Sequence, residues 1–541
     1  AGDPGFIGQD IQNILNVTVE DVERVYNEYI KNKPAIYLSM VPKDQSELVL
    51  SGSEKANIKE EKIVAGAEKE FKMKYGKEKA EFKKTPTIYD RSEPPLGEPP
   101  LLEVPTVWRG DLANGVKLYG IENNELPMVQ FTMRIDGGQS LDPQGKEGVA
   151  SILGTMLKEG TKNRTPAELE EAIDLLGSSI STSVGLEGMY ITGNTLAKNF
   201  KETISLLTEM LTEPRWDVQA FDIVKNRRMN SIKQRKTNAQ SVAFSALAKQ
   251  LYGSNHPAST PLGGTEKTVN SITMKDIKNY FESNVSPKVS HFHIAGDIKQ
   301  TTAQRLLGQL SQSWRGEKID IPEIASVQTP TKPKVFFIDI PDAKQSAISV
   351  GTLTIPGDDP ELFKLTVVNN RLGGGMEARL MRTLRLEKGY TYGAGSFLRP
   401  NSFQTPFYAY SQVRSNVTLE SLEIFKNIIN SYPESYNNED LETTKNKLIK
   451  SNALRFERLG SMLNMLDTMS KFNLDDTYIQ NEQEVLTSMK LDEAKRLAEA
   501  RLDGKKMYYV IAGDAKTQLN RISKLGYGKP IMLDRDGNTI K

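Results

Sequence analysis

The sequence of 541 residues contains no cysteine and only three histidines, His256, His291 and His293. Without cysteine, disulfides, thiolate metal sites, iron–sulfur clusters and thiol nucleophiles are excluded. No apolar run approaches the roughly 18 residues that a membrane helix needs, so no membrane span is expected. The first residues, AGDPGFIGQD, lack the basic and apolar regions of a signal peptide. Any site that needs two or three histidine ligands must therefore use these three residues.

The charge of the chain is balanced. Lysine and arginine together number 70 and aspartate and glutamate 69, which leaves a formal net charge of +1. Nucleic-acid binding needs a basic face that displaces counterions, so we expect no nucleic-acid partner. An apolar content of 38% is typical of a globular protein. Because one core rarely grows past roughly 250–300 residues, at least two domains are expected.

Three segments of the chain align without gaps: 17–44, 272–299 and 489–516. Each has apolar residues at helical spacing, a short polar turn, and then a strand-like stretch, which reads AIYLSMV, HFHIAGD and YYVIAGD in turn. The copies lie too far apart for a solenoid repeat, so each indicates the end of a whole domain. The first copy would then end a domain whose body is absent, and we expect the chain to be the C-terminal part of a longer polypeptide. Chance recurrence of a helix–strand pair is the alternative.

These patterns predict an α+β chain in five parts. The parts are a helix–strand remnant of a preceding domain (1–44), a charged and proline-rich linker (45–104), a first complete domain (105–318), a second linker (319–334) and a last domain (335–541). In each complete domain, strands are predicted at the start, middle and end, with helices between them.

Two segments carry a resemblance to a known family. The first is GVASILGTMLKEGT, residues 148–161, and the second is RLGGGMEARLMRTLRLEKGYTYGAGS, residues 371–396. Together they resemble the pitrilysin/insulinase-type zinc peptidases, which include mitochondrial processing peptidase, and the resemblance covers residues 105–541. It implies two similar domains, each a mostly antiparallel sheet packed by helices, that form a half-clamshell. The chain looks like the C-terminal, non-catalytic half of a bacterial two-half enzyme.

The first segment is a degenerate zinc motif. In the family it reads G-x-A-H-x-x-E-H, where two histidines bind zinc and the glutamate is the general base. Here Ser151 and Thr155 stand at the histidine positions and Gly154 at the glutamate position. A hydroxyl is a poor zinc ligand and glycine accepts no proton, so we expect no metal on this chain and no activity from it alone. Zinc is expected on the missing catalytic half.

The three histidines do not replace the lost ligands. His256 is expected to make structural hydrogen bonds. His291 and His293 alternate along a strand, so they share one face of it, but a third ligand is missing.

The second segment contains Arg385 and Tyr392, seven residues apart. The resemblance implies that this pair faces the zinc of the other half. Tyr392 would donate a hydrogen bond to the developing oxyanion, and Arg385 would orient the substrate backbone. Tyr390 competes with Tyr392 because it would point to the same strand face, and the spacing of seven favours Tyr392. The structural alternative is an arginine that stabilises a helix end and a half-buried strand tyrosine.

Gly373, Gly374 and Gly375 open the predicted helix that ends at Arg385. No Lys-Ser/Thr follows them, which excludes a P-loop. We expect a flexible loop that brings the backbone close to the chamber wall and to substrate. A simple turn is the alternative.

The resemblance implies a non-catalytic, substrate-binding half of a zinc metallopeptidase, a hydrolase that cleaves peptides in a closed chamber. Its partner would be a half that carries H-x-x-E-H, on the same polypeptide or as a heterodimer. The alternative is an inactive structural or assembly subunit, like the core subunits of a respiratory complex, which would have no reason to keep both Arg385 and Tyr392. The expected location is the periplasm or cell envelope, with the cytoplasm as alternative.

Overall fold

The computed structural model describes residues 5–42, 44–57, 85–92, 102–452 and 454–540. The chain divides into two compact units, residues 1–62 and 63–541. Much of the predicted first linker, residues 58–84 and 93–101, lies outside the described residues, and the predicted domain boundaries stay predictions. In the described part of the chain, no helix is both long and apolar enough to cross a membrane.

The first unit contains two helices, α1 (Phe6–Leu15) and α2 (Val19–Tyr29), and a short 3-10 turn, η1 (Ser46–Leu48). Thr18 caps α2, and its side chain and that of Asp21 form a capping box. The predicted strand AIYLSMV does not form: residues 33–42 belong to no helix or strand. A strand needs a neighbour to satisfy its backbone, and the described residues of this unit offer none. The strand prediction for the first repeat is therefore wrong for this structure.

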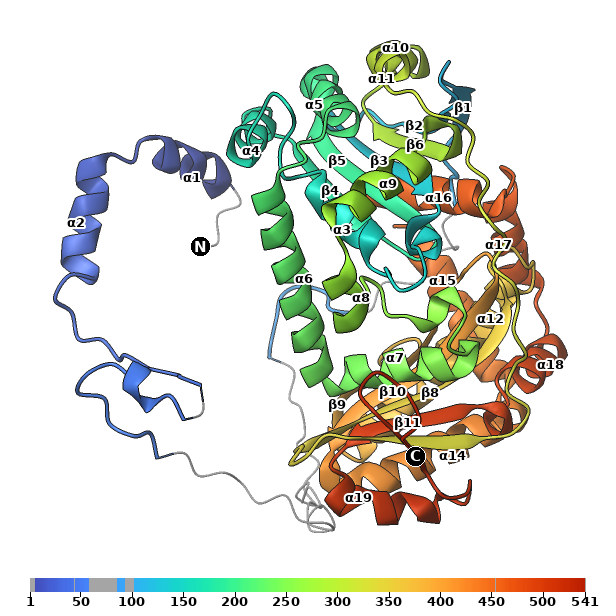
Figure 1. Cartoon of the computed structure of the whole chain (residues 1–541). Helices are drawn as coiled ribbons and strands as arrows, with labels where there is room; N and C mark the ends of the chain where they lie inside the picture. Colours follow the sequence, from blue (N-terminus) through green and yellow to red (C-terminus); the bar gives the residue numbers. More distant parts are fainter. Residues whose placement is uncertain (1–4, 43, 58–84, 93–101, 453, 541) are drawn as a thin grey trace. The chain divides into compact units, whose positions relative to one another are not determined.

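The second unit contains two six-stranded sheets (Figure 1). The first sheet has the order β1-β2-β6-β3-β5-β4, with strands β1 (Trp108–Asp111), β2 (Lys117–Glu122), β3 (Met128–Asp136), β4 (Ser179–Val184), β5 (Gly188–Leu196) and β6 (Ser290–Gly296). The second has the order β12-β7-β11-β8-β10-β9, with strands β7 (Lys334–Asp339), β8 (Gln345–Pro356), β9 (Thr391–Leu398), β10 (Gln404–Arg414), β11 (Tyr508–Gly513) and β12 (Ile531–Leu533).

The two sheets share one design. In both, the last long strand lies in the interior: β6 runs parallel to β2 and antiparallel to β3, and β11 runs parallel to β7 and antiparallel to β8. The remaining pairs are antiparallel except β12 with β7. The predicted α+β class, with two similar and mostly antiparallel sheets packed by helices, is confirmed.

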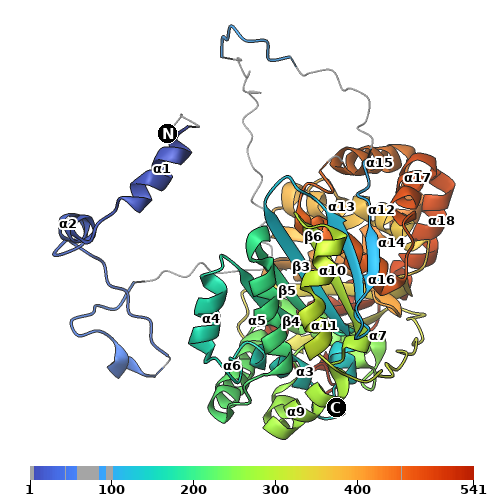
Figure 2. The same ribbon diagram turned by 90° about the horizontal axis from the view of Figure 1, so that it is seen from above.

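Helices cover both sheets. Those between the strands of the first sheet, or directly after it, are α3 (Val149–Met156), α4 (Pro166–Asp174), α5 (Phe200–Thr212), α6 (Val218–Thr237), α7 (Ala239–Tyr252), α8 (Glu266–Ser271), α9 (Met274–Asn284), α10 (Gln300–Leu306) and α11 (Gly308–Ser313). Those of the second are α12 (Leu362–Gly373), α13 (Arg379–Met381), the π-helix η7 (Arg382–Glu387), α14 (Thr418–Ser435), α15 (Asn438–Asn452), α16 (Leu459–Phe472), α17 (Tyr478–Ser488), α18 (Leu491–Arg501) and α19 (Ala515–Ile522). Figure 2, seen from above, shows α4, α5, α10 and α11 in front of the first sheet.

The second and third repeats form the predicted helix and strand, α9 with β6 and α18 with β11. Their apolar helix positions and the interior-facing strand residues are buried, for example Ile277 and Phe292 in one copy and Leu497 and Tyr509 in the other, all at 0% exposure. Burial of this stripe is what fixes each helix on its sheet.

The two halves of this unit exchange a helix. Helix α7, which follows α6 of the first half, packs on β8 and β11 of the second sheet, where Val242 and Leu247 share a buried cluster with Ala347 of β8 and Val510 of β11. Helix α16, from the second half, packs on β6, β3 and β2 of the first sheet. Figure 1 shows α7 lying along the second sheet. Each sheet therefore has one face covered by a helix of the other half.

Candidate functional site

The degenerate zinc motif lies on α3 beneath the first sheet. At its N-terminus the carboxylate of Asp142 accepts hydrogen bonds from the backbone N–H groups of Gly148, at 2.5 Å, and Ala150, at 2.9 Å. Burial raises the pKa of Asp142 to about 7, and these backbone donors partly oppose the rise because they favour the carboxylate. The helix that would carry a metal in an active relative is thus well anchored in this chain.

The guanidinium of Arg228 lies beside Ser151, the residue at the first histidine position of the motif. The Ser151 hydroxyl accepts a 2.5 Å hydrogen bond from Nη2 of Arg228 on α6. Burial lowers the pKa of Arg228 from its usual value, but a guanidinium remains charged in proteins. The Thr155 hydroxyl donates a hydrogen bond to the backbone carbonyl of Ser151, one turn earlier in the helix, at 3.2 Å. A Cβ on Gly154 would lie 3.0 Å from Cγ2 of Val184.

These residues do not fit zinc. Zinc sites need thiolate, imidazole or carboxylate ligands, whereas this place offers hydroxyls beside a positive charge. Among the residues that the structure describes, no group of three or more His, Asp or Glu side chains is arranged to hold a metal ion.

His256 makes the structural contacts expected of it. Its Nδ1 accepts a hydrogen bond from the backbone N–H of Ala258 at 3.1 Å, and its ring stacks on Tyr252 with centroids 4.7 Å apart. Burial lowers its pKa.

His291 and His293 do share one face of β6, where their rings stack 6.4 Å apart. His291 Nε2 lies 3.1 Å from Asp136, and His293 Nε2 lies 2.7 Å from the Ser470 hydroxyl on α16. Arg134 joins the same cluster through ion pairs of 2.7 Å to Asp136 and 2.8 Å to Asp467. Burial, together with the charge of Arg134, lowers the pKa of His293 well below its usual range. This polar cluster holds α16 on the first sheet.

Tyr392 projects from the end strand of the second sheet and is 89% exposed. The pairing of β9 with β10 slips here, so that Tyr392 and Gly393 lie opposite one residue, Gln412. The Gly393 N–H donates to the Thr391 hydroxyl at 3.0 Å, and the Ser411 hydroxyl donates to the Gly393 carbonyl at 3.0 Å. A β-bulge of this kind redirects a side chain. Here the hydroxyls of Thr391 and Ser411 hold the bulged backbone in place through their hydrogen bonds to Gly393.

Tyr390 has a different environment. It precedes β9 and packs against the core of the second sheet. The expectation that Tyr390 and Tyr392 point to the same face is therefore wrong, because the chain reaches the strand only at Thr391 and bulges directly afterwards. Of the two tyrosines, Tyr392 is the one whose side chain stands in solvent.

Arg385 lies in the π-helix that leads to β9. The widened turn is visible in the hydrogen bond from the Lys388 N–H to the Thr383 carbonyl, at 3.0 Å. The Arg385 side chain is exposed, and its Nη1 lies 3.8 Å from the sulfur of Met376. π-helical turns are rare and often mark functional positions.

The three glycines do not open a helix, contrary to the prediction. Gly373 is the last residue of α12, Gly374 caps it, and the next helix starts only at Arg379. A Cβ on Gly373 would lie 2.1 Å from the backbone nitrogen of Ser396 on β9. The absence of a side chain at Gly373 therefore allows α12 to pack closely against β9, the strand that carries Tyr392. Gly375 has a φ of +154°, a conformation that favours glycine.

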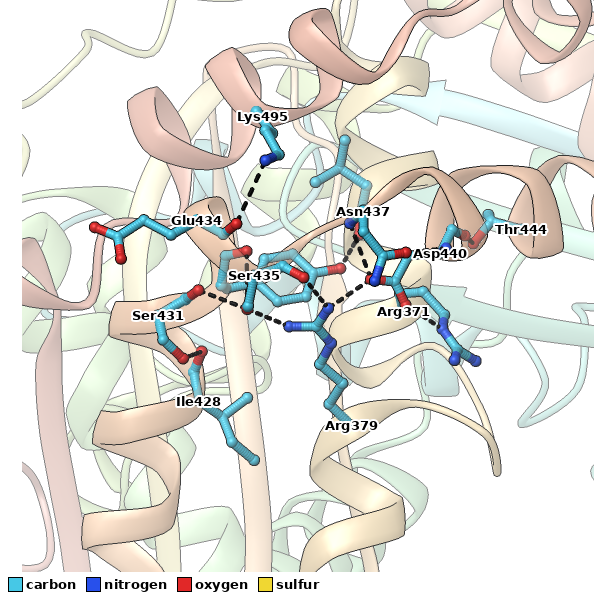
Figure 3. A network of polar contacts seen from close by, with 12 residues as sticks. Arg371, Arg379, Ile428, Ser431, Glu434, Ser435, Asn437, Asp440, Thr444 and Lys495 are labelled. Carbon is cyan, nitrogen blue, oxygen red and sulfur yellow. Dashed lines mark hydrogen bonds and ion pairs between the residues drawn. The ribbon is translucent and has the colours of Figure 1, made fainter.

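A buried ionic network fixes the segment before Arg385 (Figure 3). Asp440 on α15 accepts hydrogen bonds from Nε of Arg371 at 2.9 Å and from Nη2 of Arg379 at 2.5 Å. Arg379 also donates to the hydroxyl and carbonyl of Ser435, at 2.5 and 2.9 Å, and lies 4.9 Å from the Tyr432 ring centroid. The network ties the end of α12 and the start of α13 to α14 and α15.

A cavity of about 540 Å³ opens between α7 and the β9–β10 hairpin. Five aromatic side chains line it: Tyr190, Phe244, Tyr252, Phe397 and Tyr408. Arg235 and Arg399 add positive charge to its wall, in which Glu187 and Lys471 pair with each other at 2.8 Å. Such a wall suits an apolar group that carries or adjoins a negative charge.

Sequence reasoning missed Arg228 and the bulge at Tyr392. Arg228 lies far from Ser151 in the chain, and only the packing of α6 on α3 brings them together. The bulge could have been found in the sequence, because Gly393 and Gly395 interrupt the strand that follows Arg385, and glycine inside a strand often marks a bulge.

Comparison with known proteins identifies the family. The family model described as "Insulinase (Peptidase family M16)" matches residues 120–266, and that described as "Peptidase M16 inactive domain" matches residues 271–448. The chain belongs to peptidase family M16, as the predicted resemblance to insulinase-type peptidases states.

Individual relatives agree with this assignment. The chain is 24% identical over 400 residues to "Non-peptidase homolog YmxG" of Helicobacter pylori, a match that covers 73% of this chain and 91% of that protein. A solved "peptidase M16 inactive domain" from Pseudomonas fluorescens superposes with a TM-score of 0.69 at 23% identity, covering 75% of this chain and 98% of that chain. A protease from Helicobacter pylori superposes with a TM-score of 0.71 at 15% identity, covering 76% and 100%. The chain thus contains an M16-type inactive domain.

Proposed function

We propose that this chain is the substrate-binding, non-catalytic half of a zinc metallopeptidase. It supplies Arg385 and Tyr392 to a zinc site that another half carries. The observation that carries the proposal is the exposure of Tyr392, 89%, on a β-bulge at the end strand of the second sheet. A tyrosine held out into solvent by two backbone-bonding hydroxyls is better suited to meet a ligand than to stabilise the fold.

The chemistry of the pair supports this role. The Tyr392 phenol can donate a hydrogen bond to the oxygen that becomes negative when the scissile carbonyl is attacked. The Arg385 cation can hold a substrate backbone carbonyl or carboxylate. Since Arg228 fills the place beside Ser151 on α3, the metal and the general base must come from a partner. An H-x-x-E-H half, on the same polypeptide or a separate chain, would supply both.

Peptides are the substrate class that the surroundings favour. Strand β9 ends its sheet, so within the described residues its outer edge pairs with no other strand. An extended peptide can add to such an edge through backbone hydrogen bonds. The aromatic cavity beside the β9–β10 hairpin can receive one of its apolar side chains.

The test combines this chain with its H-x-x-E-H half and measures cleavage of a fluorogenic peptide. Tyr392→Phe keeps the ring and removes the donor, and should lower kcat on the order of 100-fold with little change in KM. Arg385→Ala should chiefly raise KM. Arg382→Ala is the matched control: it lies in the same π-helix, 62% exposed, and should leave both constants unchanged.

Unchanged kcat and KM in both Tyr392→Phe and Arg385→Ala would contradict the assigned roles. If the combined halves cleave nothing and yet bind each other, the chain is an inactive structural or assembly subunit instead. The name of the Helicobacter pylori relative, a non-peptidase homolog, is compatible with either outcome for the chain on its own.

A further inference from the structure

The aromatic cavity between α7 and the β9–β10 hairpin is walled by both sheet-bearing halves of the second unit. The first-sheet half contributes the turn between β4 and β5, with Leu186 and Glu187, and helix α7, with Phe244 and Tyr252. The second-sheet half contributes the β9–β10 hairpin, with Phe397. The volume of about 540 Å³ lies within the range of roughly 300–1,000 Å³ that is typical of ligand pockets. The cavity is therefore large enough for a bulky side chain together with a charged group.

One wall of the cavity is a cluster of aromatic rings. The ring centroid of Phe244 lies 6.1 Å from that of Phe397 and 5.5 Å from that of Tyr408, and both pairs meet edge to face. Phe397 and Tyr408 are also cross-strand partners in the hairpin. Phe397 nevertheless remains 38% exposed. A phenylalanine ring that keeps this much surface in a cavity wall offers apolar area that a ligand can remove from water.

Positive charge exceeds negative charge in the wall of the cavity. The charged residues there are Arg235, Arg399, Lys471 and Glu187. The one acid among them is already engaged, because Glu187 pairs with Lys471 at 2.8 Å and accepts hydrogen bonds from the backbone N–H and the hydroxyl of Ser402. Two cations of the wall are therefore left without a carboxylate.

Arg235 is held in place by backbone groups rather than by an acid. Its Nη1 donates to the carbonyl of Leu262 at 3.0 Å, and its Nη2 donates to the carbonyl of Gly264 at 2.7 Å. A guanidinium has five N–H donors, so three remain after these two bonds. Burial and the nearby charge of Arg228 lower the pKa of Arg235, but a guanidinium stays protonated in proteins. Arg235 is therefore a fixed cation with donors to spare.

Arg399 brings the second cation from the other half. It directly follows β9, and its side chain is exposed. Within the part of the chain that the structure describes, neither Arg235 nor Arg399 forms an ion pair. A hydrogen bond from a guanidinium to a carboxylate is stronger than one between neutral groups. The wall thus favours a ligand that has a carboxylate next to an apolar group.

We propose that this cavity binds the C-terminal residue of a peptide. An apolar or aromatic side chain packs on Phe244 and Phe397, and the free α-carboxylate binds Arg235 and Arg399. That the ligand is a peptide rests on the proposed function, whereas the need for an apolar group and a carboxylate rests on the cavity itself. This chain then selects substrates by the residue at their C-terminus.

A C-terminal residue meets both requirements at one position, because its side chain and its carboxylate leave the same Cα atom. An internal residue brings a side chain without a charge, and it would leave both arginines without an anion. The rest of the peptide has a path out of the cavity along the outer edge of β9. That edge leads to Tyr392, which precedes Phe397 by five residues, or roughly 16 Å along a strand.

Peptide binding by the full chain, without an H-x-x-E-H half, tests the proposal. The probes are a short N-terminally labelled peptide that ends in phenylalanine, the same peptide with a C-terminal amide, and the same peptide with serine as its last residue. Fluorescence anisotropy gives the Kd of each. The free acid that ends in phenylalanine should bind at least about 10-fold more tightly than either of the others. Equal Kd values for the acid and the amide would overturn the proposal, and so would the absence of saturable binding.

Variants of the wall show where the peptide binds. Arg399→Gln changes an exposed side chain, and it should weaken binding of the acid by about 10-fold while binding of the amide stays the same. Arg235→Gln should act in the same direction, whereas Phe397→Ala should weaken the acid and the amide alike. Arg305→Gln is the matched control, because Arg305 is an exposed arginine of α10 outside the cavity wall. Full preference for the acid in both Arg399→Gln and Arg235→Gln would contradict the assignment.

N-acetylphenylalanine distinguishes a peptide end from a free small acid, because it carries the same ring and carboxylate. The peptide should bind more tightly, since its backbone can also pair with β9. If N-acetylphenylalanine displaces the labelled peptide with a Kd equal to that of the peptide, the ligand is a small aromatic acid and the peptide assignment is wrong.

These measurements need no cleavage, so they separate this inference from the proposed function. If the acid and the amide bind equally while Tyr392→Phe lowers kcat, the cavity assignment is wrong and the proposed function stands. If the acid is preferred and Arg399→Gln removes that preference, while Tyr392→Phe and Arg385→Ala leave cleavage unchanged, the cavity assignment stands and the proposed function is wrong.

Discussion

Replacement of Asp440 by asparagine should destabilise the second-sheet half and the segment that leads to Arg385. The Asp440 side chain is 7% exposed, and it pairs with Arg371 and Arg379, which are 20% and 24% exposed. Loss of one partner from a buried ion pair costs about 3–5 kcal/mol because it leaves the remaining charge unpaired. Both arginines keep some solvent and other hydrogen-bond partners, so the expected loss is at the lower end, about 3 kcal/mol.

The size of the decrease in Tm shows which part of the chain unfolds as one cooperative unit. At roughly 2.1 cal/mol/K per residue, the unit 63–541 has an unfolding entropy of about 1 kcal/mol/K. A loss of about 3 kcal/mol then lowers Tm by about 3 °C. If the predicted last domain, residues 335–541, melted by itself, the same loss would lower its Tm by about 7 °C.

The effect should also depend on pH. Burial acts to raise the pKa of Asp440, but the hydrogen bond from Arg371 and the charge of Arg379 outweigh it and lower the pKa. A carboxyl whose pKa is lower in the folded state stabilises the fold above its unfolded pKa of about 3.9, and this contribution is lost as the pH falls. The difference between wild type and Asp440→Asn should therefore be full at pH 7 and shrink below about pH 4.

Calorimetry and urea unfolding at pH 7 and at pH 3.5 check these values. Glu387→Gln is the control, because Glu387 pairs with Arg382 near the same segment but both side chains are largely exposed, at 49% and 62%, and the change should stay within about 1 kcal/mol. An Asp440→Asn variant as stable as this control at pH 7 would refute the reasoning that the network is a buried, mutually dependent group.

Three further outcomes are expected. Restoring histidine, glutamate and histidine at the three degenerate motif positions should not give zinc binding by metal titration, whereas adding Arg228→Glu should, because it removes the cation and supplies a carboxylate. Gly373→Ala should lower stability in urea by about 1–3 kcal/mol, since its Cβ would lie 2.1 Å from a backbone nitrogen, while Gly308→Ala, with open space around it, should be neutral. Between pH 7 and pH 5 the unfolding free energy of the wild type should fall relative to that of His293→Gln, by up to about 1.4 kcal/mol per pH unit, because a histidine that is buried neutral loses its contribution below the unfolded pKa of about 6.5. The opposite pH dependence of Asp142, whose pKa is raised to about 7, is common to both proteins and cancels in this difference.

Local patterns predicted most of the fold. Strands are present at the start, middle and end of each complete domain, as expected, and the last two repeats form the predicted helix and strand, α9 with β6 and α18 with β11. These elements follow from alternation and helical spacing, which are properties of neighbouring residues. The stretch 35–41 has the same pattern but no strand, because strand formation depends on a partner that the pattern does not contain.

The candidate site was predictable only in part. The motif comparison placed Ser151, Gly154 and Thr155 on one helix, which is α3 in the structure. Its choice of Tyr392 over Tyr390 as the functional residue stays a prediction. It could not place Arg228 beside Ser151, because that contact depends on how α6 packs on α3. It also assigned the three glycines to the start of a helix, whereas the close approach of Gly373 to β9 depends on the tertiary fold.

The exchange of α7 and α16 affects how the chain must fold as it is synthesised. The first sheet is complete once Gly296 has been made, but the helix that covers its second face begins only at Leu459. At about 5–20 residues per second, translation of the intervening residues takes on the order of 10–30 s. During that interval the sheet face that carries Arg134, His291 and His293 has no cover from α16, so the side chains of Arg134 and His293, which are buried in the finished fold, give up their water only after the second half has been made.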